Sequence, residues 1–142
     1  MKNSIQRIAK FAVLFYVGGS AYLTIEIFYR NYTHFSMFIV GGTAFILVGG
    51  INNYLPWTMG LAKQALIGSV IITAVELIAG LIINLWLGLG VWDYSAMPLN
   101  ILGQICLPYT GAWFLLSIVG IFLDDYLRWK LYAEEKPRYF IF

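Results

Sequence analysis

The sequence predicts an all-α integral membrane protein, built as a bundle of four transmembrane helices with both termini in the cytoplasm. Two observations lead to this fold class. The 142-residue chain is 61% hydrophobic and only 11% charged, whereas soluble domains carry about 25% charged residues. Its apolar residues also gather into four long runs, each near the roughly 20 residues that a helix needs to cross the hydrocarbon core. We expect one transmembrane domain over residues 1–142, with residues 124–142 as a short cytoplasmic tail.

The four runs cover residues 8–29, 35–55, 65–89 and a last stretch from about residue 99 or 105 to 123. Each is expected to be helical, because a segment exposed to lipid must satisfy its own backbone hydrogen bonds. The alternation of a membrane barrel is absent. The first run follows basic residues as a signal peptide would, but it is too long and lacks a clear small-residue cleavage site.

Basic residues indicate the orientation. Eight of the nine lie in connections or termini on one predicted side: Lys2, Arg7, Lys10, Lys63, Arg128, Lys130, Lys136 and Arg138. Only Arg30 lies on the other side. Because cytoplasmic loops are enriched in Lys and Arg, we predict a multi-pass protein of the cell membrane with residues 31–34 and 91–97 outside. Aromatic belts are then expected at Trp57 and Trp129 inside and at Trp92 and Tyr94 outside.

The third run carries a carboxylate at depth. Glu76 lies about 18 Å along the helix from its start, near the bilayer centre. Small and polar side chains recur around it at spacings of three and four, so they share one helix face: Ser69, Thr73, Glu76, Gly80 and Asn84. An acid at this depth usually faces protein or a water-filled cavity. Glu76 is therefore predicted either to bind a ligand or proton, or to form a structural hydrogen bond between helices.

The fourth run predicts a matching polar face. If Pro98 starts the helix, then Asn100, Gln104, Pro108 and Gly111 fall on one side, and Pro108 should bend the helix. We expect a polar pocket between the third and fourth helices, open to the outside. Its predicted residues are Glu76, Asn84, Trp92, Asp93, Tyr94, Asn100 and Gln104. The alternatives are that the amides join helices and that Trp92 and Asp93 only anchor the interface and cap a turn.

Several charged residues have simpler expected roles. Glu26 and Arg30 lie four apart and can form an ion pair, although Arg30 could equally reach Asp93. His34 has no second ligand at metal-binding spacing, so no metal site is expected. The acidic residues near the C-terminus are expected on a solvated cytoplasmic face: Asp124, Asp125, Glu134 and Glu135.

Glycines and a serine are expected where helices approach closely, because they remove side-chain bulk. They lie in the first, second and fourth runs: Gly18, Gly19, Ser20, Gly41, Gly42, Gly49, Gly50, Gly111 and Gly120. Enzymatic signatures are missing from the sequence, which has no phosphate-binding loop, HExxH, GxSxG or CxxC motif. We therefore expect no enzyme activity and no cofactor. The net charge of +2 is too small and too scattered to predict binding to nucleic acid.

Two long segments carry a family resemblance that covers nearly the whole chain: ELIAGLIINLWLGLGVWDYSAMPLNILGQICLPY and FLLSIVGIFLDDYLRWKLYAEEKPRY. Together with the upstream YRNYTHFSMFIVGG, they resemble the bacterial putative ABC-transporter type IV family, also called CmpB-like, to which vertebrate transmembrane 229 proteins are related. The resemblance implies a role in transport. It singles out Glu76, Gly80, Asn84, Trp92, Asp93, Tyr94, Asn100, Gly103 and Gln104.

The leading hypothesis is a small permease-like membrane protein that binds or translocates a small or lipid-like solute. It would act as a homo-oligomer or with a separate ATPase subunit. The second hypothesis is a non-transporting interaction or scaffold protein within the membrane, and the third is a lipid-modifying enzyme.

Overall fold

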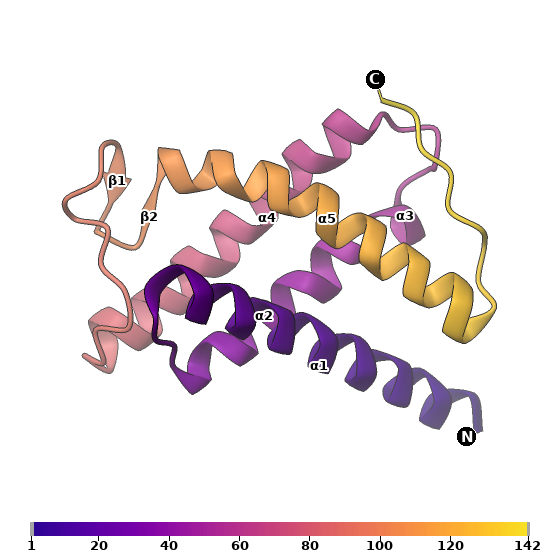
Figure 1. The fold of residues 1–142 in the computed structure, drawn as a ribbon, viewed down its shortest axis with the longest axis horizontal. Coiled ribbons are helices and arrows are strands. Elements are labelled where there is room, and N and C mark those ends of the chain that lie inside the picture. Colours follow the sequence, from indigo (N-terminus) through magenta and orange to yellow (C-terminus); the bar gives the residue numbers. More distant parts are fainter. Residues whose placement is uncertain (1, 142) are drawn as a thin grey trace.

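The computed structural model describes residues 2–141 as a helical bundle (Figure 1). Its elements are α1 (Lys2–Arg30), α2 (Phe35–Gly49), α3 (Ile51–Tyr54), α4 (Leu61–Gly80), the π-helix η1 (Leu81–Trp86), the strands β1 (Asn100–Ile101) and β2 (Ile105–Cys106), and α5 (Leu107–Tyr132). Within these residues, four helical segments are long and apolar enough to cross a membrane: Asn3–Arg30, Phe35–Tyr54, Leu61–Trp86 and Leu107–Tyr132. The predicted all-α membrane bundle is confirmed.

Helix α2 is central to the packing, because it packs against α1, α4 and α5. The backbones of α1 and α5 lie farther apart, and these two helices meet through side chains such as Tyr22 and Trp113. Small residues allow the close approach of α1 and α2. A Cβ atom added at Gly41 would lie 2.5 Å from Cβ of Tyr22, and one added at Gly42 would lie 2.8 Å from the Phe15 ring. The predicted role of these glycines in helix packing is confirmed here. It is wrong for Gly111, where an added Cβ would meet open space.

The bundle has two distinct ends. The end that we call the termini end holds the start of α1, the end of the described chain and the connection from α3 to α4 (Figure 1). The opposite loop end holds the α1–α2 connection and the strands β1 and β2 (Figure 1). The two loops of this end are joined, because Arg30 Nη1 and the Tyr32 hydroxyl both donate to the Val91 carbonyl, at 3.2 and 2.9 Å.

The side of the membrane that each end faces stays a prediction from the basic residues. We expect that, in intact cells, a membrane-impermeant thiol reagent labels Ser95→Cys and does not label Lys136→Cys, since both positions are exposed but lie at opposite ends. The background is Cys106→Ser, which removes the buried native thiol. Labelling after permeabilisation provides the control for reactivity. Labelling of position 136 alone in intact cells would reverse the topology.

The fourth span begins near the later of its two predicted starts, residue 105 and not residue 99. Helix α5 starts at Leu107 with Pro108 in its first turn, where a missing N–H costs nothing. The predicted helix start at Pro98 and the bend at Pro108 are therefore wrong. Residues 100–106 instead form a small antiparallel pair of strands, β1 with β2. The reversal between them places Leu102 and Gly103 at φ of 55° and 70°, a left-handed conformation that breaks a helix.

The end of α5 also differs from the prediction, because it continues to Tyr132 and its acidic pair is buried. Asp124 is 0% exposed and Asp125 is 3% exposed, so the expected solvated face is wrong for both. Arg128 Nε donates to Asp124 Oδ1 at 2.5 Å. Tyr139 lies in the segment after α5 and donates its hydroxyl to Asp125 at 2.8 Å. Residues 133–141 thus return to the bundle, where Phe140 accepts from the first residue of α4.

Candidate functional site

Glu76 lies inside the protein, where both of its carboxylate oxygens are engaged. Its residue exposure is 4%. The Tyr94 hydroxyl donates to Oε1 at 2.7 Å and Trp113 Nε1 donates to Oε2 at 2.9 Å. The predicted burial of Glu76 by protein is confirmed. Burial is the larger cause that raises the pKa of Tyr94, and the nearby Glu76 carboxylate raises it further. The Tyr94 hydroxyl therefore remains a donor throughout the physiological pH range.

The polar stripe around Glu76 joins α4 to α5. The Ser69 hydroxyl donates to the Thr110 carbonyl at 2.6 Å, and the hydroxyls of Thr73 and Thr110 lie 3.0 Å apart. Gly80 lets Gln104 approach, since an added Cβ would lie 2.5 Å from Gln104 Oε1. These contacts favour the structural interpretation of this face, because each polar side chain has a partner on the facing segment.

The amides predicted to line a pocket instead bond to one another. Asn84 Nδ2 donates to Gln104 Oε1 at 2.8 Å, and Asn84 Oδ1 accepts from the Val91 amide at 2.7 Å. Trp92 Nε1 donates to the Gln104 carbonyl at 3.0 Å. Trp92 is 5% exposed and Gln104 is 3% exposed. Trp92, predicted at the rim of the pocket, is therefore buried, and the amide groups predicted to line the pocket are bonded to each other.

An open cleft occurs elsewhere, between α1 and α5. Its part nearer the loop end is a cavity of about 190 Å³ that combines aromatic rings with an ion pair. It is lined by Tyr22, Ile25, Glu26, Tyr29, Arg30, Tyr94, Tyr109, Ala112 and Trp113. Arg30 pairs with Glu26 at 2.7 Å, which confirms the predicted ion pair. Tyr94 and Trp113 belong both to this lining and to the hydrogen bonds on Glu76, so the Glu76 carboxylate lies directly behind the cavity wall.

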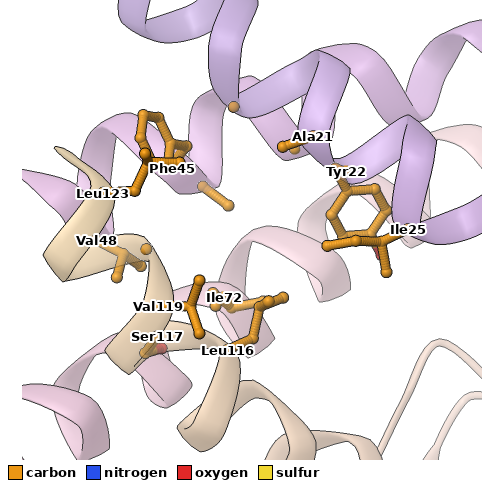
Figure 2. A pocket seen from close by; sticks show the side chains of 14 residues that line it. Ala21, Tyr22, Ile25, Phe45, Val48, Ile72, Leu116, Ser117, Val119 and Leu123 are labelled. Atoms are coloured by element: carbon orange, nitrogen blue, oxygen red, sulfur yellow. The ribbon is translucent and has the colours of Figure 1, made fainter. Parts of the chain in front are cut away.

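The deeper part of the cleft is a cavity of about 100 Å³ with an apolar lining. Figure 2 shows side chains from several helices around it, including Ala21, Phe45, Ile72, Leu116 and Val119. Tyr22 and Ile25 line both cavities, so the two are adjacent along α1. We call them together the α1–α5 cleft.

Contacts close the α1–α5 cleft at its two ends. At the loop end, the hydroxyls of Tyr29 and Tyr109 lie 2.9 Å apart. At the termini end, Lys10 Nζ lies 3.0 Å from Glu134 Oε2. The α1–α5 cleft lies between these two ties. Sequence reasoning missed this site, although the spacing of Tyr22, Glu26 and Tyr29 at four and three residues was a usable signal.

The comparison with protein families agrees with this architecture. A family model described as putative ABC-transporter type IV matches residues 11–139. This chain belongs to that family. Neither the search of curated proteins nor the search of solved structures found a match. As a member of the putative ABC-transporter type IV family with four candidate spans, it is a multi-pass protein of the lipid bilayer. The relation to vertebrate transmembrane 229 proteins stays a prediction.

The remaining residues that the family resemblance singled out shape the loop above the spans. Asn100 Nδ2 donates to the Met97 carbonyl at 2.9 Å, and its Oδ1 accepts from the Gly103 amide at 3.1 Å. Asp93 is exposed and its Oδ1 accepts from the Ser95 amide at 2.8 Å. Hydrogen bonding by the Ser95 side chain and, to a smaller extent, by this amide holds the pKa of Asp93 below its usual value. The alternative pairing of Arg30 with Asp93 is not formed. Family membership thus highlights residues that build this loop.

We expect Gln104→Ala to lower the free energy of unfolding by about 1–3 kcal/mol, because it leaves the Asn84 amide without an acceptor inside the protein. Asp93→Asn is the matched comparison, since it changes an exposed residue in the same loop and should leave the melting temperature nearly unchanged. Thermal unfolding of the purified variants in one detergent tests both. A larger loss for Asp93→Asn than for Gln104→Ala would contradict this account of the loop.

Proposed function

We propose that this protein is a small permease-like membrane component that binds a lipid-like solute in the α1–α5 cleft and takes part in its translocation. The observation that carries the proposal is that two unlike cavities lie next to each other and share Tyr22 and Ile25. The deeper one offers an apolar lining for a hydrocarbon chain, and the one nearer the loop end offers tyrosine hydroxyls and the Glu26–Arg30 pair. A largely apolar cavity with a few converging polar groups is the usual form of a small-ligand site.

The route into the cleft supports a ligand that arrives from the bilayer. Between the tied ends, α1 and α5 meet through side chains such as Tyr22 and Trp113 and not through close backbone packing, so a chain could enter sideways by displacing side chains alone. The predicted pocket between the third and fourth spans is replaced in this proposal, because its polar groups are engaged with one another.

Membership in an ABC-transporter family suggests that ATP hydrolysis drives the translocation. The 142 residues contain no phosphate-binding loop that could bind ATP. We therefore propose a separate ATPase subunit as a partner. We also propose that Glu76 has no catalytic role, because Tyr94 and Trp113 occupy both of its carboxylate oxygens.

A photoactivatable fatty acid with a diazirine at its chain end tests the binding step. In nanodiscs, we expect it to label residues of the deeper cavity, such as Phe45 and Leu116. Ala21→Leu should reduce this labelling at least fivefold, because the larger side chain projects into the cavity. Ala74→Leu is the matched control, since it makes the same change on an exposed face of α4. Equal labelling of both variants would refute the assigned cleft.

Transport requires a second measurement. Proteoliposomes would be screened with a panel of lipids and small solutes, in the absence and presence of an ATPase subunit identified by co-purification. Saturable flux that Ala21→Leu reduces and Ala74→Leu preserves supports the permease proposal. Specific labelling of the cleft without flux under any condition would instead favour the scaffold hypothesis.

A further inference from the structure

A second, separate cavity lies at the termini end of the bundle and has no place in the proposed lipid site. It measures about 170 Å³ and is lined mainly by polar side chains, among them Asn52, Trp57, Asp125, Arg128, Glu134 and Glu135. None of its lining residues belongs to the α1–α5 cleft. Its lining residues lie in α3 and in the connection between α3 and α4, and also in α5 and in the segment after it.

One carboxylate that lines this cavity has no described cation within ion-pair distance, because Arg128, which lines the same cavity, pairs with Asp124 behind it. The other two acids of the lining have ion-pair partners within 4.0 Å: Glu134 with Lys10, and Glu135 with Arg138. Among the side chains described over residues 3–141, no such pair reaches Asp125. Asp125 is 3% exposed, and its Oδ2 accepts only from the neutral groups of Asn52 and Tyr139, each at 2.8 Å. A buried charge held by neutral donors attracts a cation.

A buried acceptor in the same cavity lacks a donor. Asn52 is 6% exposed, and its Nδ2 is used by Asp125. This bond orients the amide so that Oδ1 is the free atom, and Oδ1 has no hydrogen-bond partner. Buried acceptors are rarely left unsatisfied, because each costs about 1–3 kcal/mol. The missing component is therefore a group that carries N–H or O–H donors as well as positive charge.

The donor set argues against a metal ion. Within the part of the chain that the structure describes, no group of three or more His, Cys, Asp or Glu side chains could hold one. Asn52 supplies a single amide oxygen, whereas hard cations take six or more oxygen ligands. A compact ammonium fits better, because it has three N–H donors for separate acceptors. The indole of Trp57 lines the same cavity, and the face of an indole ring attracts a cation.

We propose that this cavity binds a primary ammonium group, with Asp125 supplying the opposite charge and Asn52 Oδ1 accepting one N–H bond. The ammonium comes either from a free alkylamine or from a lysine side chain of a partner protein. The site is independent of the α1–α5 cleft, so it stands whether or not the lipid proposal holds.

The first test measures binding of n-butylammonium, which reproduces the end of a lysine side chain, to the full-length protein in nanodiscs by saturation-transfer NMR. Tetramethylammonium carries the same charge without N–H donors and should bind at least tenfold more weakly. Asp125→Asn should weaken butylammonium binding at least tenfold, whereas Glu26→Gln, in the other cavity, should not change it. Equal binding of the two cations, or no effect of Asp125→Asn in a folded variant, would overturn the proposal.

A tethered ammonium tests the site even if Asp125→Asn folds poorly. Asn53 is exposed and lines the cavity, so Asn53→Lys can place its own ammonium there. We expect Asn53→Lys to melt at a higher temperature than Asn53→Met and to abolish butylammonium binding, while Asn53→Met melts like the original protein. A lower melting temperature for Asn53→Lys than for Asn53→Met would count against the site.

The two sources of the ammonium are separated by a short blocked peptide with one lysine. If this peptide competes with butylammonium at similar concentrations, the opening of the cavity is wide enough for a lysine side chain of a partner protein. Binding of butylammonium without competition by the peptide indicates a free amine. Failure of both ligands to bind would refute the proposal, and it would leave the labelling of the α1–α5 cleft unaffected.

Discussion

Replacing Arg128 by methionine is expected to lower the free energy of unfolding by about 3–5 kcal/mol, the usual cost of removing one partner from a buried ion pair. The reason is the carboxylate of Asp124, which is 0% exposed and whose Oδ1 accepts a hydrogen bond from Arg128 Nε at 2.5 Å. Methionine preserves much of the apolar length of the side chain but leaves this carboxylate without its cation. Reversible denaturant unfolding in mixed micelles provides the measurement.

Two further variants separate charge burial from loss of packing. Lys130→Met makes the same kind of change at an exposed position in the last turn of α5, and it should cost less than about 1 kcal/mol. Asp124→Asn should recover part of the loss when it is combined with Arg128→Met, because it removes the uncompensated charge. If the double variant is less stable than Arg128→Met alone, the buried ion pair is not the cause of the loss.

Replacing Glu76 by leucine is expected to lower the free energy of unfolding by about 2–6 kcal/mol, because each of two donors left unsatisfied inside the protein costs about 1–3 kcal/mol. These donors are the Tyr94 hydroxyl and Trp113 Nε1. Glu76→Gln should cost less, since its amide oxygen still accepts one of the two bonds. The same unfolding measurement ranks the two variants.

The cause can be tested by removing the donors. In a background of Tyr94→Phe and Trp113→Phe, Glu76→Leu should cost less than it does in the original protein, because no donor is then left without an acceptor. An equal cost in the two backgrounds would show that Glu76 stabilises the bundle through some other contact. Since Tyr94 belongs to the loop and Trp113 to α5, this network also ties the loop to the membrane-spanning helices.

Some features of this protein follow from the sequence alone because their causes are local. Long apolar runs predict helices that cross the bilayer, since the backbone must satisfy its own hydrogen bonds in lipid. The spacing of four residues predicts the Glu26–Arg30 pair, because such neighbours lie on one helix face. The depth of Glu76 predicts its burial by protein, since an acid facing hydrocarbon is too costly.

Other features were decided only by the tertiary structure. Asp124 and Asp125 end an apolar run, a position that is typical of a solvated helix end, yet both are buried. Asp125 accepts hydrogen bonds from two residues distant in the chain, Asn52 and Tyr139. Pro98 was predicted to start the fourth helix and Pro108 to bend it, but residues 100–106 contain the paired strands β1 and β2, so the helix starts at Leu107 with Pro108 in its first turn. The α1–α5 cleft exists because glycines bring α1 close to α2 while α5 packs against α2 and α4. Periodicity shows which residues share a helix face, but the packing of all the helices together determines what that face meets.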